Sequence, residues 1–222
     1  MQKVASIFDI IGPVMVGPSS SHTAGAVRLG VLARAIYGGE PARARISLHG
    51  SFAATSEGHG TKRALVAGLL GMGVDDIRIV DAPTIARQRG HDYTFQTVDI
   101  DEAHPNTVLF ELGEGDGIRF VQGSSIGGGN VQVTHIDGFT VAIDGTLPLL
   151  VLRHRDKPGA VSAATEVLAR SGINIATMQV SRQRRGQEAL TLIETDTPLD
   201  PSVLTSLIAL KKISSVVTVP VV

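Results

Sequence analysis

The sequence contains no cysteine and no tryptophan among its 222 residues, and aromatic residues make up only 4% of the chain. The absence of cysteine excludes disulfides, zinc–thiolate sites and any iron–sulfur cluster held by thiolates of this chain alone. The low aromatic content argues against recognition of bases or sugars by stacking. The chain also has no large excess of positive or negative charge, because 20 Lys and Arg balance 21 Asp and Glu. This balance argues against a nucleic-acid or anionic-membrane partner.

Long hydrophobic runs are missing as well. No leading segment combines basic and apolar residues, and no apolar run is long enough to span a bilayer. We therefore expect a soluble, cytoplasmic protein without a membrane partner. The 43% apolar content suffices for a buried core, and the length suits one large domain or two small ones.

The most unusual stretch is Gly17-Pro-Ser-Ser-Ser-His-Thr-Ala-Gly25, which directly precedes a helical apolar run that begins near Ala26. Hydroxyl side chains are favoured N-caps, but one helix needs only one. The surplus hydroxyls and the positive end of the helix dipole suit a carboxylate or a phosphate, although an ordinary capped loop has a similar composition. The candidate binding residues are Ser19, Ser20, Ser21 and Thr23, with His22 among them.

A second loop of the same kind follows the alternating stretch Arg43–His49, which predicts a strand. The loop Gly50–Thr61 brings hydroxyls and an imidazole to the next predicted helix. Two such loops indicate two walls of one polar site; the alternative is a pair of ordinary glycine-rich connections, the second of them with Thr61 as the helix cap. An imidazole titrates near neutral pH, so His59 and His22 are the candidate acid–base groups, and the sequence does not choose between them. Thr55 joins the candidate substrate-binding residues.

We expect residues 1–145 to form one domain with a mixed sheet and helices. An apolar lead-in at Met1–Ile11 comes first, and Gly123–Gly129 reads as a flexible loop with two hydroxyls. Asp137-Gly138 predicts a tight hairpin, and His135 reads as a structural strand residue. From Ala82 onwards the domain reads as mainly β. The predicted strands are Ile77–Asp81, Tyr93–Ile100, Thr107–Leu112, Ile118–Val121, Val131–Ile136 and Phe139–Ile143.

Residues 148–222 predict a ferredoxin-like βαββαβ domain, which makes the whole chain α+β. Pro158 is expected to start its first helix, which ends at Ser171, and Asp200-Pro201 to start its second. The predicted strands are Leu149–His154, Asn174–Arg182, Glu188–Thr195 and Ile213–Val219.

This second domain resembles an ACT domain, a regulatory module that binds amino acids. The resemblance rests on His154-Arg-Asp-Lys-Pro-Gly159 and Gly172-Ile-Asn-Ile175. It implies a serine-like effector held across a domain–domain interface by His154, Asn174 and the loop Asp156–Gly159, whose N–H groups would face a carboxylate. Asp156 stands where the serine-sensing family pattern has Asn. The resemblance also implies a homodimer paired through residues 148–222.

The front half resembles the β subunit of the iron–sulfur-dependent L-serine dehydratases. The matching strings are Gly17-Pro-Ser-Ser-Ser-His-Thr23, His49-Gly-Ser-Phe-Ala-Ala-Thr55, Gly58-His-Gly60 and the glycines Gly127–Gly129. It is also similar to a substrate-binding allosteric domain of some phosphoglycerate dehydrogenases.

The dehydratase resemblance implies an α-subunit partner that carries a [4Fe–4S] cluster, and deamination of L-serine to pyruvate and ammonia. The iron would act on the β-hydroxyl while a base removes the Cα proton. This cysteine-free chain would hold no metal and would supply substrate contacts and an imidazole. The alternative is a regulatory serine-binding module that controls a partner enzyme and lends it no catalytic group.

Overall fold

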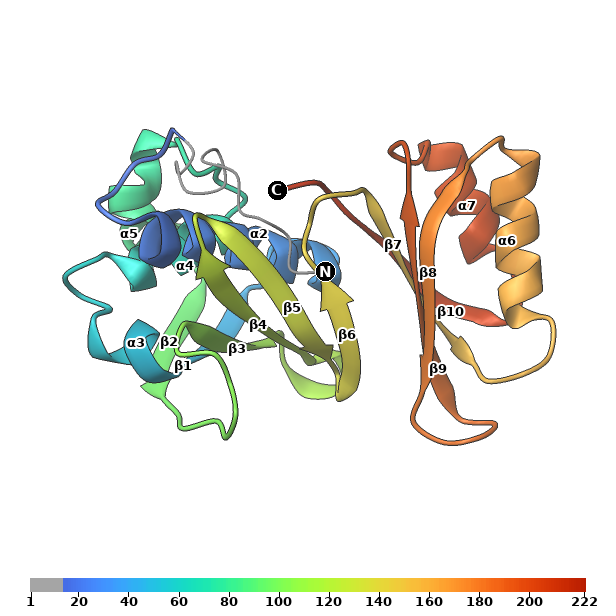
Figure 1. The fold of residues 1–222 in the computed structure, drawn as a ribbon, viewed down its shortest axis with the longest axis horizontal. Helices are drawn as coiled ribbons and strands as arrows, with labels where there is room; N and C mark the ends of the chain where they lie inside the picture. Colours follow the sequence, from blue (N-terminus) through green and yellow to red (C-terminus); the bar gives the residue numbers. More distant parts are fainter. Residues whose placement is uncertain (1–13) are drawn as a thin grey trace, which may run out of the picture. The chain divides into compact units, whose positions relative to one another are not determined.

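The computed structural model describes residues 14–222, apart from the side chain of Asp116. The apolar lead-in predicted at Met1–Ile11 lies outside these residues. The chain divides into two compact units, one ending at Asp144 and the other spanning Gly145–Val222 (Figure 1). In the described part of the chain, no helix is both long and apolar enough to cross a bilayer.

The first unit is built on a six-stranded mixed sheet, as predicted. Its strand order is β2-β1-β3-β4-β5-β6, in which β1 and β2 are parallel and every other neighbouring pair is antiparallel. Alternation of polar and apolar residues buries one face of the outer strand β6. The strands are β1 (Arg43–Leu48), β2 (Asp92–Thr97), β3 (Thr107–Leu112), β4 (Arg119–Gly127), β5 (Asn130–Ile136) and β6 (Phe139–Ile143).

Helix α2 packs on β4 and β5 and against α4, and α5 packs against α4 and β2. The core between the helices and the sheet includes Leu29, Leu65 and Phe110, which are fully buried. The π-helical turn η1 leads directly into α2. The helical elements are η1 (Ser20–Ala24), α2 (Gly25–Tyr37), α3 (Gly50–Ala54), α4 (Thr61–Leu69), η2 (Ile77–Asp81), α5 (Ala82–Gln88) and η3 (Gly115–Gly117).

The strand predicted at Ile77–Asp81 is wrong: this stretch is the 3₁₀ helix η2, and α5 follows it where the sequence read as mainly β. The Asp76 side chain accepts from the Arg78 N–H and so caps the turn, and Pro83 lies in the first turn of α5. Only Ile79 of the apolar residues in η2 is buried, whereas Ile77 is 79% exposed. The apolar residues of Ile77–Asp81 predict a strand, but in the 3₁₀ helix η2 only one of their side chains is buried.

The loop predicted at Gly123–Gly129 is also wrong, because β4 continues to Gly127 and pairs with β5. Register shifts at Gly123 and Gly127 accommodate the glycines as bulges. The connection between the two strands is reduced to Gly128 and Gly129, both with positive φ. The Asp137-Gly138 hairpin is confirmed, with φ of 47° and 80° as a type I′ turn requires, and His135 lies in β5.

The second unit has the predicted βαββαβ order, and all neighbouring strands of its sheet are antiparallel in the order β10-β7-β9-β8. Its core joins Leu150, Leu152 and Ile193 of the sheet to Leu168 and Leu207 of the two helices. The elements are β7 (Leu149–Arg155), α6 (Ala160–Arg170), β8 (Ile175–Arg182), β9 (Glu188–Thr195), α7 (Pro201–Ile208) and β10 (Ile213–Val219).

Helix α6 begins at Ala160 and not at Pro158, because Gly159 has φ 81° and forms a turn ahead of the helix. Asp200 precedes α7 as predicted, with Pro201 in the first turn, although the Asp200 side chain makes no capping hydrogen bond. Both differences are local and leave the ferredoxin-like topology intact.

Candidate active site

The serine-rich motif forms the start of α2, and Ser19 is its N-cap. Ser19 has extended backbone angles, and its hydroxyl accepts from the His22 N–H at 3.1 Å. The prediction of a cap within the serine run is therefore confirmed, and the helical backbone begins earlier than expected, at the π-turn η1. Ser20 and Ser21 lie half-buried on this turn, and their hydroxyls make no hydrogen bond with any other residue that the structure describes.

His22 lies against the second motif. Its Nε2 is 3.0 Å from Ser51 Oγ of α3, and the edge of its ring meets the Phe52 ring at a centroid distance of 5.4 Å. The His59 ring lies 4.9 Å away. Burial, and then the charge of His59, lower the pKa of His22, while hydrogen bonding to Ser51 opposes this shift. His22 is therefore neutral at neutral pH and able to accept a proton.

The loop between α3 and α4 holds His59. Thr55 donates its hydroxyl to the Ser51 carbonyl, and the His59 N–H donates to the Thr55 carbonyl. Thr23 of the first motif donates its hydroxyl to the His59 carbonyl at 3.0 Å, which ties the two motifs together. The structure thus brings His22, His59 and Thr23 to one place, whereas the Thr55 hydroxyl is used inside its own loop.

Three buried polar atoms around this place have no hydrogen-bond partner among the described residues: His59 Nδ1, Thr61 Oγ1 and Ser125 Oγ. Thr61 is the first residue of α4, and Gly60, with φ 69°, is the N-cap of this helix, so Thr61 does not have the capping role that the alternative of an ordinary loop gave it. An unsatisfied buried polar group costs about 1–3 kcal/mol. Atoms of this kind beside two imidazoles indicate a place for a polar ligand.

Ser125 and Arg28 are residues that sequence reasoning did not select. Ser125 lies on β4 and is fully buried beside Gly25 and η1. The Arg28 side chain of α2 donates to the Gly129 carbonyl at 2.8 Å and so fixes the glycine turn after β4; burial lowers its pKa. The two hydroxyls of Gly123–Gly129 were the sequence signal that could have pointed to Ser125. Because this stretch was predicted to be a loop, the sequence did not indicate which way its side chains point.

The residues predicted to hold an effector in the second unit do not meet within one chain. His154 is paired with Ala189 of β9, whereas Asn174 lies beside Asp196, just past the end of β9. Ala189 and Asp196 are seven residues apart, which corresponds to ~23 Å of extended chain. His154 is buried, and its ring nitrogens bond Thr191 Oγ1 at 2.7 Å and the Arg155 carbonyl at 2.9 Å.

The remaining predicted effector residues are also engaged. Asp156 accepts from the Gly186 N–H and from Arg182, and these bonds lower its pKa in that order. Asn174 donates to Asp196 at 2.7 Å. Gly159 lies beside Lys212, whose amine donates to the Pro158 carbonyl. The four residues form no continuous site in a single copy.

The chemistry of the donor set does not suit a metal cluster. The chain has no cysteine, and residues 14–222 contain no group of three or more His, Asp or Glu arranged to hold a metal ion. An iron–sulfur cluster therefore does not fit the residues of this chain.

Fold and site together define a two-unit α+β chain with a polar site at two helix starts and a C-terminal ACT module. The ACT domain model matches residues 149–212, and the model described as the serine dehydratase beta chain matches residues 6–89. A probable L-serine dehydratase, beta chain, from Bacillus subtilis is 44% identical and covers 96% of this chain and 97% of its own length.

The L-serine dehydratase, beta chain, of Peptoniphilus asaccharolyticus is 36% identical over 95% of this chain and 96% of its own. The chain therefore belongs to the serine dehydratase beta-chain family. D-3-phosphoglycerate dehydrogenase of Bacillus subtilis is 28% identical over 69% of this chain and 30% of its own length, which agrees with the second resemblance noted from the sequence.

Proposed function

We propose that this chain, with an α subunit that carries a [4Fe–4S] cluster, converts L-serine to pyruvate and ammonia. The observation that carries this proposal is the pair of imidazoles 4.9 Å apart, of which His59 Nδ1 has no partner among the described residues, together with the unpartnered buried hydroxyls of Thr61 and Ser125. The beta-chain names of the relatives support the need for a partner. Because this chain cannot hold the cluster, its own residues bind the substrate and move protons.

The substrate carboxylate would lie at the start of α2, where the Ser20 and Ser21 hydroxyls make no hydrogen bond with any other described residue. Removal of the Cα proton and loss of the β-hydroxyl as water give 2-aminoacrylate. Addition of water to the imine tautomer then releases ammonia and leaves pyruvate. His22 and His59 act as one acid–base unit, since two imidazoles this close do not both stay protonated.

The test is anaerobic reconstitution with the α subunit and measurement of pyruvate. This chain alone should give no turnover, and the pair should. His22→Gln and His59→Gln should each lower kcat by about 10²–10⁴-fold, the usual contribution of general acid–base catalysis, while binding of the α subunit persists. A reconstituted pair that forms no pyruvate would refute the proposal.

The matched ACT domain favours a second, regulatory role. We propose that residues 145–222 sense an amino acid and pair with a second copy along the edge strand β8. Antiparallel pairing of two β8 strands would bring Asn174 of one copy toward Arg182 and Asp156 of the other. If the whole chain is only regulatory, the two histidine variants will change the response to serine at an undiminished maximal rate.

A further inference from the structure

Arg28 of α2 is a half-buried cation that forms no ion pair with any residue in the described part of the chain. Its guanidinium donates to the Gly129 carbonyl at 2.8 Å, a bond that leaves its charge uncompensated and most of its N–H donors unused. The other Lys and Arg residues between 14 and 222 that are not exposed each pair with a carboxylate; they are Arg34, Lys62, Arg119 and Arg153.

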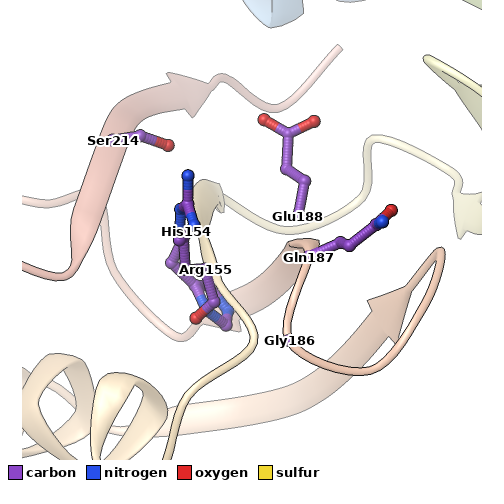
Figure 2. A pocket seen from close by; sticks show the side chains of 6 residues that line it. All are labelled: His154, Arg155, Gly186, Gln187, Glu188 and Ser214. Carbon is purple, nitrogen blue, oxygen red and sulfur yellow. The ribbon is translucent and has the colours of Figure 1, made fainter.

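The missing carboxylate matters at Arg28 because its side chain is taken out of water. Burial lowers the pKa of Arg28, so its surroundings disfavour the charge that it carries. Arg155 also has no ion pair among the described residues, but it is exposed and lines a cavity of about 500 Å³ with Glu188 and Ser214 (Figure 2). Water solvates Arg155, whereas an anion from outside the chain would offset the cost of burying Arg28.

The position of Arg28 directs its charge to the start of α2. Long side chains of a helix lie over the turn that precedes their own Cα, and for Arg28 this turn contains Gly25. Ser125 packs against Gly25, and its fully buried hydroxyl has no hydrogen-bond partner among the described residues. Gly129, which accepts from Arg28, belongs to the short connection that follows the strand of Ser125. An unpaired cation and an unpartnered hydroxyl therefore border the same helix start.

We propose that Arg28 binds the carboxylate of L-serine and makes the reaction specific for substrates that carry this group. A guanidinium presents a planar pair of donors that matches a carboxylate, and the helix start favours the same anion. This role rests on the proposed dehydratase function and names the residue that selects its substrate. A carboxylate of the α subunit is the competing anion. The substrate is favoured because Ser21, four residues before Gly25, also has an unpartnered hydroxyl, and a substrate with several polar groups would use both.

The test compares L-serine with L-serinamide, in which a neutral amide replaces the carboxylate, on the reconstituted pair. Ammonia is measured for both, since L-serinamide would give pyruvamide and ammonia. Arg28→Gln should raise the KM for L-serine about 10–100-fold with little change in kcat, and should leave kcat/KM for L-serinamide nearly unchanged. Arg28→Lys keeps the charge without the planar pair of donors, so its KM should lie between those of the wild type and Arg28→Gln.

Arg34→Gln is the matched control. Arg34 is a half-buried residue of the same helix and also donates to a carbonyl, that of Leu69 at 3.2 Å, but it has its own carboxylate in Glu40. The variant should leave the ratio of kcat/KM for L-serine to that for L-serinamide at the wild-type value. Calorimetry with L-alanine, which has no β-hydroxyl to lose, measures binding to the pair without turnover, and Arg28→Gln should weaken this binding about tenfold or more.

Three results would overturn the proposal. They are equal affinity of the wild type and Arg28→Gln for L-alanine, an equal loss of kcat/KM for both substrates, which would mean that Arg28 only holds the glycine turn, and weaker binding of the α subunit at an unchanged substrate ratio. A wild-type pair that forms no pyruvate would refute the dehydratase function, and the calorimetry would still decide whether Arg28 binds a carboxylate.

Discussion

A Cβ atom on Gly25 would lie 2.8 Å from Ser125 Cβ and closer still to Ser125 Oγ. The Ser125 hydroxyl can rotate to another staggered position, but its Cβ is fixed to the backbone of β4 and cannot retreat without shifting the strand. Gly25→Ala should therefore destabilise the first unit by about 1–3 kcal/mol, as overpacking does, and should lower kcat by displacing η1. Urea unfolding and reconstituted pyruvate formation measure the two effects.

Two further variants test whether Gly25→Ala destabilises the unit because its methyl group collides with Ser125, or because the two loops tolerate no added side chain. Gly58→Ala is the matched control, because nothing lies within 4 Å of its added Cβ and Gly58 has no positive φ. The double variant Gly25→Ala/Ser125→Gly removes the colliding atoms and should regain most of the lost stability. An equally unstable double variant would contradict this account.

The pKa of His22 should respond to His59. Because the charge of His59 contributes to lowering the His22 pKa, His59→Gln should move the His22 titration to higher pH, toward its ordinary value. The wild-type shift also makes folding stability rise with pH, since the unfolded chain binds the proton more tightly than the folded one. NMR titration of the His22 ring resonances measures the shift, and an unchanged midpoint would contradict the assigned cause.

Single residues of the site were predictable where the chemistry is local. The serine run required a cap, and Ser19 supplies it through a bond to the His22 N–H three residues away. The contact of His22 with Ser51 spans 29 residues, and Ser125 meets Gly25 across 100 positions of sequence. Contacts of this range depend on how α2 lies on the sheet, and no local pattern encodes that.

At the scale of elements, α2 and α4 cross at two glycines. A Cβ on Gly68 would lie 2.7 Å from Gly30 Cα and closer to the Val27 carbonyl. Because backbone faces backbone, neither helix can give way by changing a rotamer. The close crossing places the starts of α2 and α4, and with them His22 and His59, side by side.

Gly68→Ala should therefore destabilise the first unit by at least about 1–3 kcal/mol, despite the better helix propensity of alanine. Gly39→Ala, where the added Cβ meets nothing within 4 Å, is the control and should be neutral. The urea midpoints of the two variants decide the question, and equal midpoints would show that the crossing tolerates a methyl group.

The elements with a clear period and clear end signals were predicted well: β3, β6, β9 and β10 have the expected bounds. The wrong predictions occur where the residue type does not indicate the structure that the segment adopts. Ile77 and Val80 suggested a strand but are exposed on η2, and the glycines of β4 suggested a loop but form bulges in a paired strand. The conformations of η2 and β4 both depend on residues that are distant in sequence and adjacent in the fold.

At the scale of the whole molecule, the edge of the ACT sheet bears on assembly. Met178 and Val180 of β8 stand opposite Ile193 and Thr191 of β9, which places them on the face that α6 and α7 cover. They are nevertheless 46% and 48% exposed. An unpaired edge strand with exposed apolar side chains favours pairing with another strand, and a second copy of the chain offers the same edge.

We predict that the chain is a dimer in solution and that Met178→Lys/Val180→Lys converts it to a monomer, because the substitutions place two charges where the second copy would bury them. Ile208→Lys on α7 is the matched control, since Ile208 is 60% exposed and lies outside the sheet edge; it should leave the dimer intact. Sedimentation velocity measures the mass of each variant. A wild-type chain that sediments as a monomer across the micromolar range would disprove pairing through β8, and the effector would then have to be held within one copy.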